Sequence, residues 1–152
     1  MAALFTIEQN LLTEITLVSS GASLANGANS ALSSALNNVA GGTSTVNGYK
    51  RGKFRFSGSF GSAPNANGGL SIYAIQGDST GTTYETSNVA PPPNIPIATI
   101  AMDATNTTQV RDSEDVDLPA GYWKILVYNN GTGQTVSSTW VLTLMPITDQ
   151  GW

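Results

Sequence analysis

Short strand-like runs, separated by clusters of turn-forming residues, fill the chain from residue 48 onward. The runs are KFRFSGSF, GLSIYAIQ, TTYETS, IATIAMDA, TQVRDSEDVDL, YWKILVYN and VSSTWVLTLMP. The separators, among them GSAPNANGG and GDSTG, are rich in Gly, Pro, Asn and Asp, which end strands and form turns. This pattern, without a long helical segment, predicts an all-β fold: a single β-sandwich or jelly-roll domain with an N-terminal arm.

Two runs near the C-terminal end have a clear two-residue period. Trp123, Ile125 and Val127 fall on one strand face, opposite Tyr122, Lys124, Leu126 and Tyr128. Trp140, Leu142 and Leu144 likewise share a face. Such alternation indicates strands with one buried face. Between them, YNNGTGQ (128–134) predicts a hairpin turn, because Asn and Gly adopt positive φ at little cost.

A proline cluster, VAPPPNIP (89–96), interrupts the strand pattern. Proline lacks the amide donor that a sheet interior needs. The cluster therefore predicts a stiff, extended connection on the outside of the domain, either a crossover between sheets or a ligand for a proline-recognition module.

The first 47 residues differ from the rest and are rich in Ala, Ser, Asn and Gly. We therefore divide the chain into an N-terminal arm with the first strand or strands (1–47) and a β-sandwich domain (48–152). EITLVSS (14–20) favours a strand, whereas helical spacing favours a short amphipathic helix. The residues with that spacing are Leu4, Ile7, Leu11 and Ile15. The segment is either a first strand with a loose loop or an arm that lies on a neighbouring subunit.

The composition argues against several functions. Cys and His are both absent, which removes thiolate chemistry, the commonest general base and the commonest metal ligand. No nucleophile elbow, phosphate loop or metal-ligand spacing occurs. We expect no enzymatic activity, no cofactor, no metal and no small-molecule substrate. The N-terminal stretch lacks a basic n-region and carries Glu8 and Glu14, so we expect neither a signal peptide nor a membrane partner.

Only 11% of the residues are charged, against about 25% in ordinary soluble domains. Four of the six cations nevertheless cluster between positions 50 and 55, at Lys50, Arg51, Lys53 and Arg55. The last three alternate on one strand face, which leaves Phe54 and Phe56 to enter the core. Cations at a sheet edge commonly prevent aggregation. The net charge of −4, with aromatics facing away from the cations, argues against a nucleic-acid partner.

A matching acidic run holds four of the ten carboxylates: Asp112, Glu114, Asp115 and Asp117. It is either a solvated strand and loop, a partner for the basic cluster or a Ca²⁺ site, although it lacks the glycine and the final Glu of an EF-hand loop. Separate patches of opposite sign suit contacts between subunits. We therefore predict that these eight charged residues form an interface.

Carbohydrate binding is the main alternative. Exposed aromatic side chains on a β-sandwich can stack on sugars, and the candidates are Tyr73, Tyr84, Tyr122, Tyr128 and Trp152. Interface tyrosines and core tryptophans would explain the same residues.

The stretch from Gly69 to Pro146 resembles the capsid cement or decoration proteins of tailed bacteriophages. The resemblance lies in the order of GLSIYAIQGDSTGTTYETS, VAPPPNIPIATIAM, DVDLPAGYWKILVYNNGTGQT and WVLTLMP, and the upstream ITLVSSGASLANGANSA is similar in character. It implies a β-sandwich or jelly roll on the outside of an icosahedral head, a homotrimer that binds the major capsid protein, and synthesis in a bacterial host. The alternatives are a carbohydrate-binding module for host adhesion and a tail- or fibre-associated structural protein.

Overall fold

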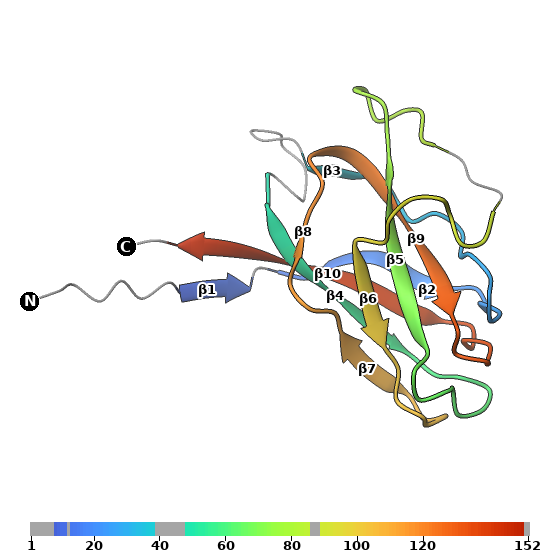
Figure 1. Ribbon diagram of the computed structural model, residues 1–152. Helices are drawn as coiled ribbons and strands as arrows, with labels where there is room; N and C mark the ends of the chain where they lie inside the picture. The colour runs from blue at the N-terminus through green and yellow to red at the C-terminus, as the bar shows by residue number, and fades with distance from the viewer. Residues whose placement is uncertain (1–7, 12, 39–47, 86–88, 151–152) are drawn as a thin grey trace, which may run out of the picture.

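The computed structural model describes residues 8–11, 13–38, 48–85 and 89–150, in which ten strands and no helix occur (Figure 1). The strands are β1 (Glu8–Leu11), β2 (Ile15–Gly21), β3 (Leu36–Asn38), β4 (Arg51–Gly58), β5 (Gly69–Gln76), β6 (Ala98–Ala101), β7 (Gln109–Asp112), β8 (Val116–Asp117), β9 (Gly121–Asn130) and β10 (Trp140–Gln150). The all-β class is confirmed. No helix within the described residues is long and apolar enough to cross a membrane.

The strands form two antiparallel sheets. In the six-stranded sheet, β10 pairs with β1 and β2 along one side and with β4 along the other, and β4 also pairs with β7 and β8. In the four-stranded sheet the order is β3-β9-β5-β6. Pairing is long and regular at the centre of each sheet, where β5 lies beside β9 and β4 beside β10.

One hydrophobic core lies between the two sheets and takes side chains from both. The predicted inward residues are confirmed as buried: Phe54, Phe56, Trp123, Ile125, Val127, Trp140, Leu142 and Leu144. Burial of each such side chain contributes about 1.5–3 kcal/mol, which offsets the entropy lost on ordering the chain. The two-residue period therefore correctly identifies the strand faces that enter this core. The expectation of a single buried face is wrong for part of β9 and β10, because Leu126, Thr143 and Met145 on the opposite faces are buried as well.

Residues 15–38 contribute to both sheets and to the core. β2 pairs with β10, β3 pairs with β9, and Leu17, Leu24 and Leu36 are buried. The strand interpretation is correct, and the helical alternative is wrong for residues 8–11 and 15–21, because β10 supplies their backbone hydrogen-bond partners. Residues 1–7 and 39–47 of the predicted arm lie outside the described residues.

The predicted hairpin after β9 is wrong. Gly131 and Gly133 have the expected positive φ, but β9 and β10 belong to different sheets. Residues 131–139 instead cross from one sheet to the other, with Val136 buried between bridges to Leu24 and Phe60. Turn residues specify local backbone angles and leave strand pairing undetermined, which explains the error.

The proline-rich connection also differs from its prediction. It is outside regular strands, as expected, but it joins β5 to β6, which are neighbours in one sheet, so it is no crossover between sheets. The predicted strand TTYETS is absent over residues 82–85, where Tyr84 forms only an isolated bridge to Gly77. Residues 86–88 lie outside the described residues.

The run TQVRDSEDVDL divides into β7 and β8 because Ser113 replaces regular strand pairing. Its N–H donates to the carbonyl of Phe54 (2.8 Å), and its hydroxyl accepts from the N–H of Phe54 (3.0 Å). The charged residues on either side therefore remain aligned with β4.

The edges of the two sheets meet along two seams. At the closed seam, β6 of the four-stranded sheet lies near β7 of the six-stranded sheet. At the open seam, β2 faces residues 29–34, which run beside β9. Each seam is formed by consecutive parts of the chain that pass from one sheet to the other.

Both described ends of the chain leave the body together. Pairing between β10 and β4 ends where Ile147 faces Arg51, whereas β1 continues beside β10 as far as the Glu8–Gln150 pair. This two-stranded extension, which we call the terminal ribbon (residues 8–11 with 147–150), projects from the body in Figure 1.

Candidate functional site

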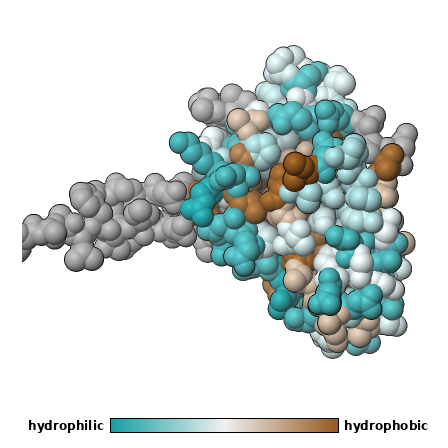
Figure 2. All heavy atoms as spheres, in the orientation of Figure 1, coloured by the Kyte–Doolittle hydropathy of each residue, from teal (hydrophilic) through white to brown (hydrophobic). Residues whose placement is uncertain are grey.

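A charged strip runs along β4, β7 and β8. It consists of Glu14, Lys50, Arg51, Lys53, Arg55, Asp112, Glu114, Asp115 and Asp117. Strand pairing creates it, because Arg55 faces Asp112 and Arg51 faces Asp117 in the backbone register. Figure 2 shows hydrophilic residues gathered on the side of the body toward which the terminal ribbon extends.

Arg55 is the centre of the strip. Its Nε and Nη2 donate to the two carboxylate oxygens of Asp112 at 2.8 and 3.0 Å, and its Nη1 donates to Glu14 Oε1 at 2.8 Å. Two parallel bonds to one carboxylate fix the geometry of the guanidinium plane. This arrangement fastens β4 both to β7 and to the residue that precedes β2.

A second group of ion pairs surrounds Asp115. Arg51 Nη2 lies 2.8 Å from Asp115 Oδ2, and Lys53 Nζ lies 3.3 Å from Oδ1. The two cations lie on the same face of β4 as Arg55, as the alternation predicts. Asp115 therefore receives both cations in the short loop between β7 and β8.

Hydrogen bonding within the strip shifts two pKa values. The side-chain hydrogen bond from Arg55 lowers the pKa of Asp112, and partial burial opposes this shift. The same hydrogen bond raises the pKa of Arg55. Because both side chains are more than a third exposed, solvent screens the pair, and we expect it to contribute at most about 1 kcal/mol.

Five of the eight predicted interface residues thus come together within a single chain: Arg51, Lys53, Arg55, Asp112 and Asp115. Lys50, Glu114 and Asp117 lie in the same strip and are exposed. Glu14, which also belongs to the strip, was not identified from the sequence. The strip holds four cations and five carboxylates, so it is nearly neutral. Its role as an interface stays a prediction.

No group of three or more acidic residues in the described part of the chain is arranged to hold a metal ion. Asp112 and Asp115 form ion pairs with cations of β4.

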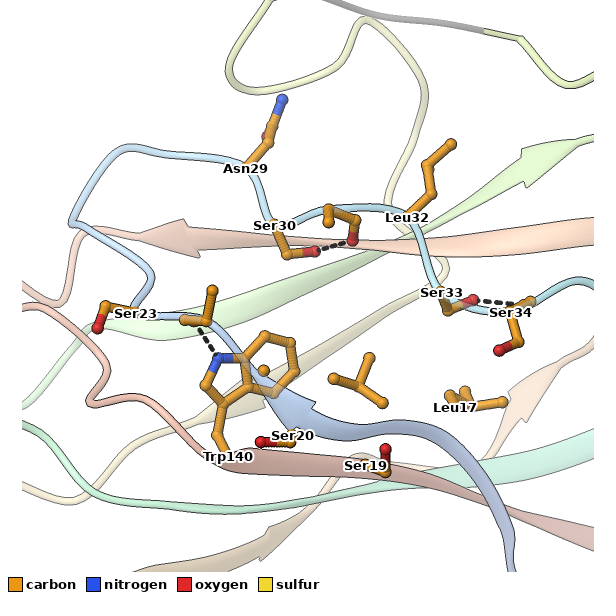
Figure 3. Close-up of a pocket in the computed structure, with 14 residues that line it drawn as sticks. Leu17, Ser19, Ser20, Ser23, Asn29, Ser30, Leu32, Ser33, Ser34 and Trp140 are labelled. Carbon is orange, nitrogen blue, oxygen red and sulfur yellow. Dashed lines mark hydrogen bonds between the residues drawn. The ribbon is translucent and has the colours of Figure 1, made fainter.

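A groove of about 560 Å³ lies along the open seam (Figure 3). Residues 17–23 line one side, residues 29–34 line the other, and Trp140 lies between them. Most of the lining side chains are small, and serine hydroxyls are frequent. Leu32, on the rim, is one of the few large exposed apolar side chains of the described surface.

Two serines attach the second wall of the groove to β9. Ser33 donates its N–H to the carbonyl of Ile125 (2.9 Å) and accepts from the Ile125 N–H on its hydroxyl oxygen (2.8 Å). Ser30 makes the same pair of bonds with Val127, at 2.7 and 3.0 Å. Each hydroxyl oxygen accepts the bond that a backbone carbonyl would accept in a regular strand, so residues 30–35 run beside β9 without forming a strand.

Trp140 closes the inner side of the groove. Its indole Nε1 donates to the carbonyl of Ala22 at 2.8 Å, and its ring packs against Gly21. A Cβ atom at position 21 would lie only 2.0 Å from the ring. Glycine is therefore required for β2 to approach the tryptophan this closely.

The tyrosines proposed for sugar binding form a second, smaller cluster on the outer face of the four-stranded sheet. Tyr73 is buried with Ile75 and Leu126, and Tyr84 and Tyr128 pack against them. Burial raises the pKa values of Tyr73 and Tyr84.

A short loop covers part of this tyrosine cluster. The Asp78 carboxylate accepts hydrogen bonds from the backbone N–H groups of Thr80, Thr82 and Thr83, which organise the loop. Hydrogen bonds from the backbone N–H of Thr82 and from the hydroxyl of Thr80 are the main causes of its strongly lowered pKa. The loop then places Gly81 against the ring of Tyr122. Tyr84, Tyr122 and Tyr128 are half-buried and contact their own chain, and Trp152 lies outside the described residues.

The groove could not be found from the sequence. Its lining residues lie in a stretch of Ser, Ala, Asn and Gly that has no periodicity and reads as a loose loop. Comparison with family models, curated proteins and solved structures gives no match.

Proposed function

We propose that the protein is a virion structural protein, a capsid decoration or cement protein. It binds the major capsid protein on the outside of a tailed-phage head as a homotrimer and stabilises contacts between neighbouring capsid subunits. The two sheets would form a β-sandwich of the jelly-roll kind. The order of segments from Gly69 to Pro146 supports this proposal, because those segments correspond to the central strands β5, β9 and β10.

The terminal ribbon is the observation that carries the proposal. An isolated pair of strands is at best marginally stable in water, so a ribbon that leaves the body gains stability from a neighbouring molecule. Its base adjoins the charged strip, since Arg51 faces Ile147 where the body ends. The ribbon and the strip thus offer two adjoining contact surfaces, as a protein that links neighbouring subunits requires.

Because the strip is nearly neutral, it would contribute more to the specificity of a contact than to the long-range electrostatic attraction of a partner. Alternating cations and carboxylates fix the register of a partner with complementary charges, and they add little affinity. Lys50, Glu114 and Asp117 lie on exposed positions and are the members best placed to meet such a partner. We expect the ion pairs of Arg55 to hold the strip in shape.

Cementing follows from mass action. A protein that binds only the expanded capsid lattice stabilises that lattice by its free energy of binding. Many symmetric copies make modest individual contacts sufficient. This function involves no catalysis, cofactor, nucleic acid or membrane.

Sugar binding is a weaker proposal. The tyrosines that would stack on a sugar pack on one another and on residues 77–85. Lys124 Nζ also lies 4.4 Å from the centre of the Tyr84 ring, so that ring already has a cationic neighbour.

Co-sedimentation tests the proposal. Purified protein is mixed with immature and with expanded heads of a tailed phage that encodes it, both stripped of decoration, and the pellets are compared. We expect it to sediment with expanded heads only and to raise their temperature of disruption. Lys50→Glu with Asp117→Lys should weaken attachment, whereas Thr99→Glu, an exposed position on β6, should leave it unchanged. Equal recovery in the presence and absence of heads would refute the proposal.

A further inference from the structure

We propose that the proline-rich segment, residues 89–96, is a contact surface for a partner protein that presents exposed aromatic side chains. The segment carries no charge and shares no residue with the charged strip. The inference goes beyond the proposed function and does not depend on it.

The length of the connection is the first reason. β5 and β6 are antiparallel neighbours in one sheet, yet residues 77–97, a stretch of 21 residues, join them. Neighbouring antiparallel strands need only about two to five residues, and connections longer than about 15 residues usually have a function. Residues 77–85 cover part of the tyrosine cluster, whereas most of residues 89–96 face solvent. The sheet therefore does not require the second part of this connection.

The exposure of its apolar side chains is the second reason. Seven of the eight residues of VAPPPNIP are apolar, and six of the eight are exposed. Ile95 is 87% exposed and Val89 is 63% exposed, the two highest values among the large apolar side chains that the structure describes. Apolar surface that is gathered in one exposed place marks contact sites on soluble proteins, whereas single exposed residues do not.

Leu32 adds to this surface near one end of the segment. The side-chain amide of Asn29 donates to the carbonyl of Val89 at 2.8 Å, which holds the segment beside residues 29–34. Figure 3 shows Leu32 and Asn29 pointing to the same side, away from Trp140. The exposed leucine therefore lies on the side of the molecule that carries the segment.

The segment is held in place by its own chain. Pro92 is buried, and the side-chain amide of Asn94 donates to Glu85 Oε2 at 3.3 Å. The N–H of Ile97, just after the segment, donates to the carbonyl of Ile72 at 2.8 Å. The four prolines also restrict the backbone. A surface that is ordered in advance loses little conformational entropy on binding, which favours affinity.

The chemistry of the segment indicates the kind of partner. Its prolines lack N–H donors, so it offers mainly proline rings, apolar side chains and carbonyl acceptors. Aromatic side chains with a polar end pack on proline rings and donate to carbonyls, and aromatic-lined grooves recognise proline-rich segments in this way. A charged partner would leave its charges unpaired. Residues 89–102 contain no cation to meet anionic lipid headgroups, which favours a protein over a membrane.

Methyl-detected NMR tests the inference on the intact chain. Protein labelled at the Ile and Val methyl groups is titrated with N-acetyltryptophanamide and, separately, with N-acetylleucinamide. We expect the tryptophan probe to shift the methyl signals of Val89 and Ile95 and to bind about fivefold more tightly than the leucine probe. Val110, which is 60% exposed on β7, is the internal control and should shift little, because its strand, QVRD, contains no proline.

Matched variants distinguish the segment from non-specific apolar binding. Val89→Ser should weaken binding of the tryptophan probe, whereas Val110→Ser, at nearly the same exposure, should not. Pro93→Ala with Pro96→Ala should abolish the preference for tryptophan over leucine. Both prolines are exposed, so we expect the circular dichroism spectrum of this double variant to stay that of the folded protein.

Three results would overturn the inference. Equal affinity for the two probes, or equal shifts at Val89 and Val110, would exclude an aromatic-binding surface. Shifts at Val89 and Ile95 that depend on protein concentration alone would assign the segment to a second copy of the chain. Sedimentation with phosphatidylcholine vesicles that is lost in Ile95→Ser would assign it to a lipid surface. Attachment to phage heads is tested separately, by the variants of the charged strip.

Discussion

The two seams are formed in the same way, but one is closed by side-chain hydrogen bonds and the other is open as a groove. Each is formed where the chain passes from one sheet to the other, from β6 to β7 or from β2 to residues 29–34. At the closed seam the buried Gln109 of β7 reaches back to the chain after β6. Its amide accepts from the N–H of Asp103 and donates to the carbonyls of Asp103 and Thr105, at 2.8–2.9 Å. The open seam is instead lined mostly by small side chains.

The two seams thus differ in the side chains at their edges. Arg111 extends the closure of the first seam, with Nη1 3.0 Å from Asp103 Oδ2 and Nε donating to the carbonyl of Ala101. In the second seam, Ser30 and Ser33 use their hydroxyls on β9 and leave nothing to reach β2.

The largest expected effect is at the floor of the open seam. Trp140→Ala removes a buried ring that packs on Gly21 and Phe56, and it should lower the free energy of unfolding by about 3–5 kcal/mol. Urea denaturation measures this loss. Trp140→Phe, which keeps an aromatic ring, should cost less. A loss below about 1 kcal/mol for the alanine variant would show that the groove floor is not packed as described.

Next in size is the opening of the closed seam. Gln109→Ala leaves the backbone groups of Asp103 and Thr105 without their partner, so it should lower the free energy of unfolding by about 2–3 kcal/mol. Hydrogen exchange at the amide of Asp103 should accelerate, while exchange in β9 follows only the global change. Thr108→Ala, at an exposed neighbouring position, is the control. Unchanged exchange at Asp103 would show that Gln109 does not hold the seam.

A smaller effect on the free energy of unfolding is expected for Asp112, at the end of β7 that pairs with Arg55 of β4. The pKa of Asp112 is lowered in the folded state, so its contribution to stability is present above the unfolded pKa of about 3.9 and is lost as the pH falls through the folded pKa. Asp112→Asn should therefore lower the free energy of unfolding by up to about 1 kcal/mol at pH 7, and the difference should shrink below about pH 4. A difference that is constant with pH would exclude ionisation of Asp112 as the cause.

The smallest effect is expected for the exposed ion pair of the closed seam. Arg111→Met should cost about 0.5 kcal/mol or less at low salt, because Arg111 and Asp103 are 40% and 55% exposed. High salt should reduce that cost further. A loss as large as that of Gln109→Ala would mean that charge, rather than the buried amide, closes the seam.

The sequence was sufficient for the all-β class and for the core-facing residues of the main strands, because packing of one strand face against a core produces a two-residue period. It was insufficient for the connections. Gly131 and Gly133 indicate positive φ whether the chain turns back or crosses to the other sheet. The proline cluster likewise excludes regular pairing without specifying which strands it joins.

The candidate site was predictable to a similar extent. Alternation along β4 places Arg51, Lys53 and Arg55 on one face, and the structure pairs them with Asp112 and Asp115 of the same chain. Glu14 joins them through the pairing of β2 with β10, a long-range contact without a local signal. The groove is the space left between two segments of mostly small side chains, and no sequence motif indicates such a space.

The serine pairing along β9 has a consequence for behaviour at high concentration. A regular edge strand can copy its hydrogen-bond pattern onto another molecule, and that molecule onto the next, which is how sheets grow into fibres. Residues 30–35 break this repetition, because the hydroxyls of Ser30 and Ser33, not a strand backbone, meet the amides of Val127 and Ile125. We therefore expect residues 30–35 to resist this kind of growth, in contrast to the regular pairing that β3 makes with β9 on the same side.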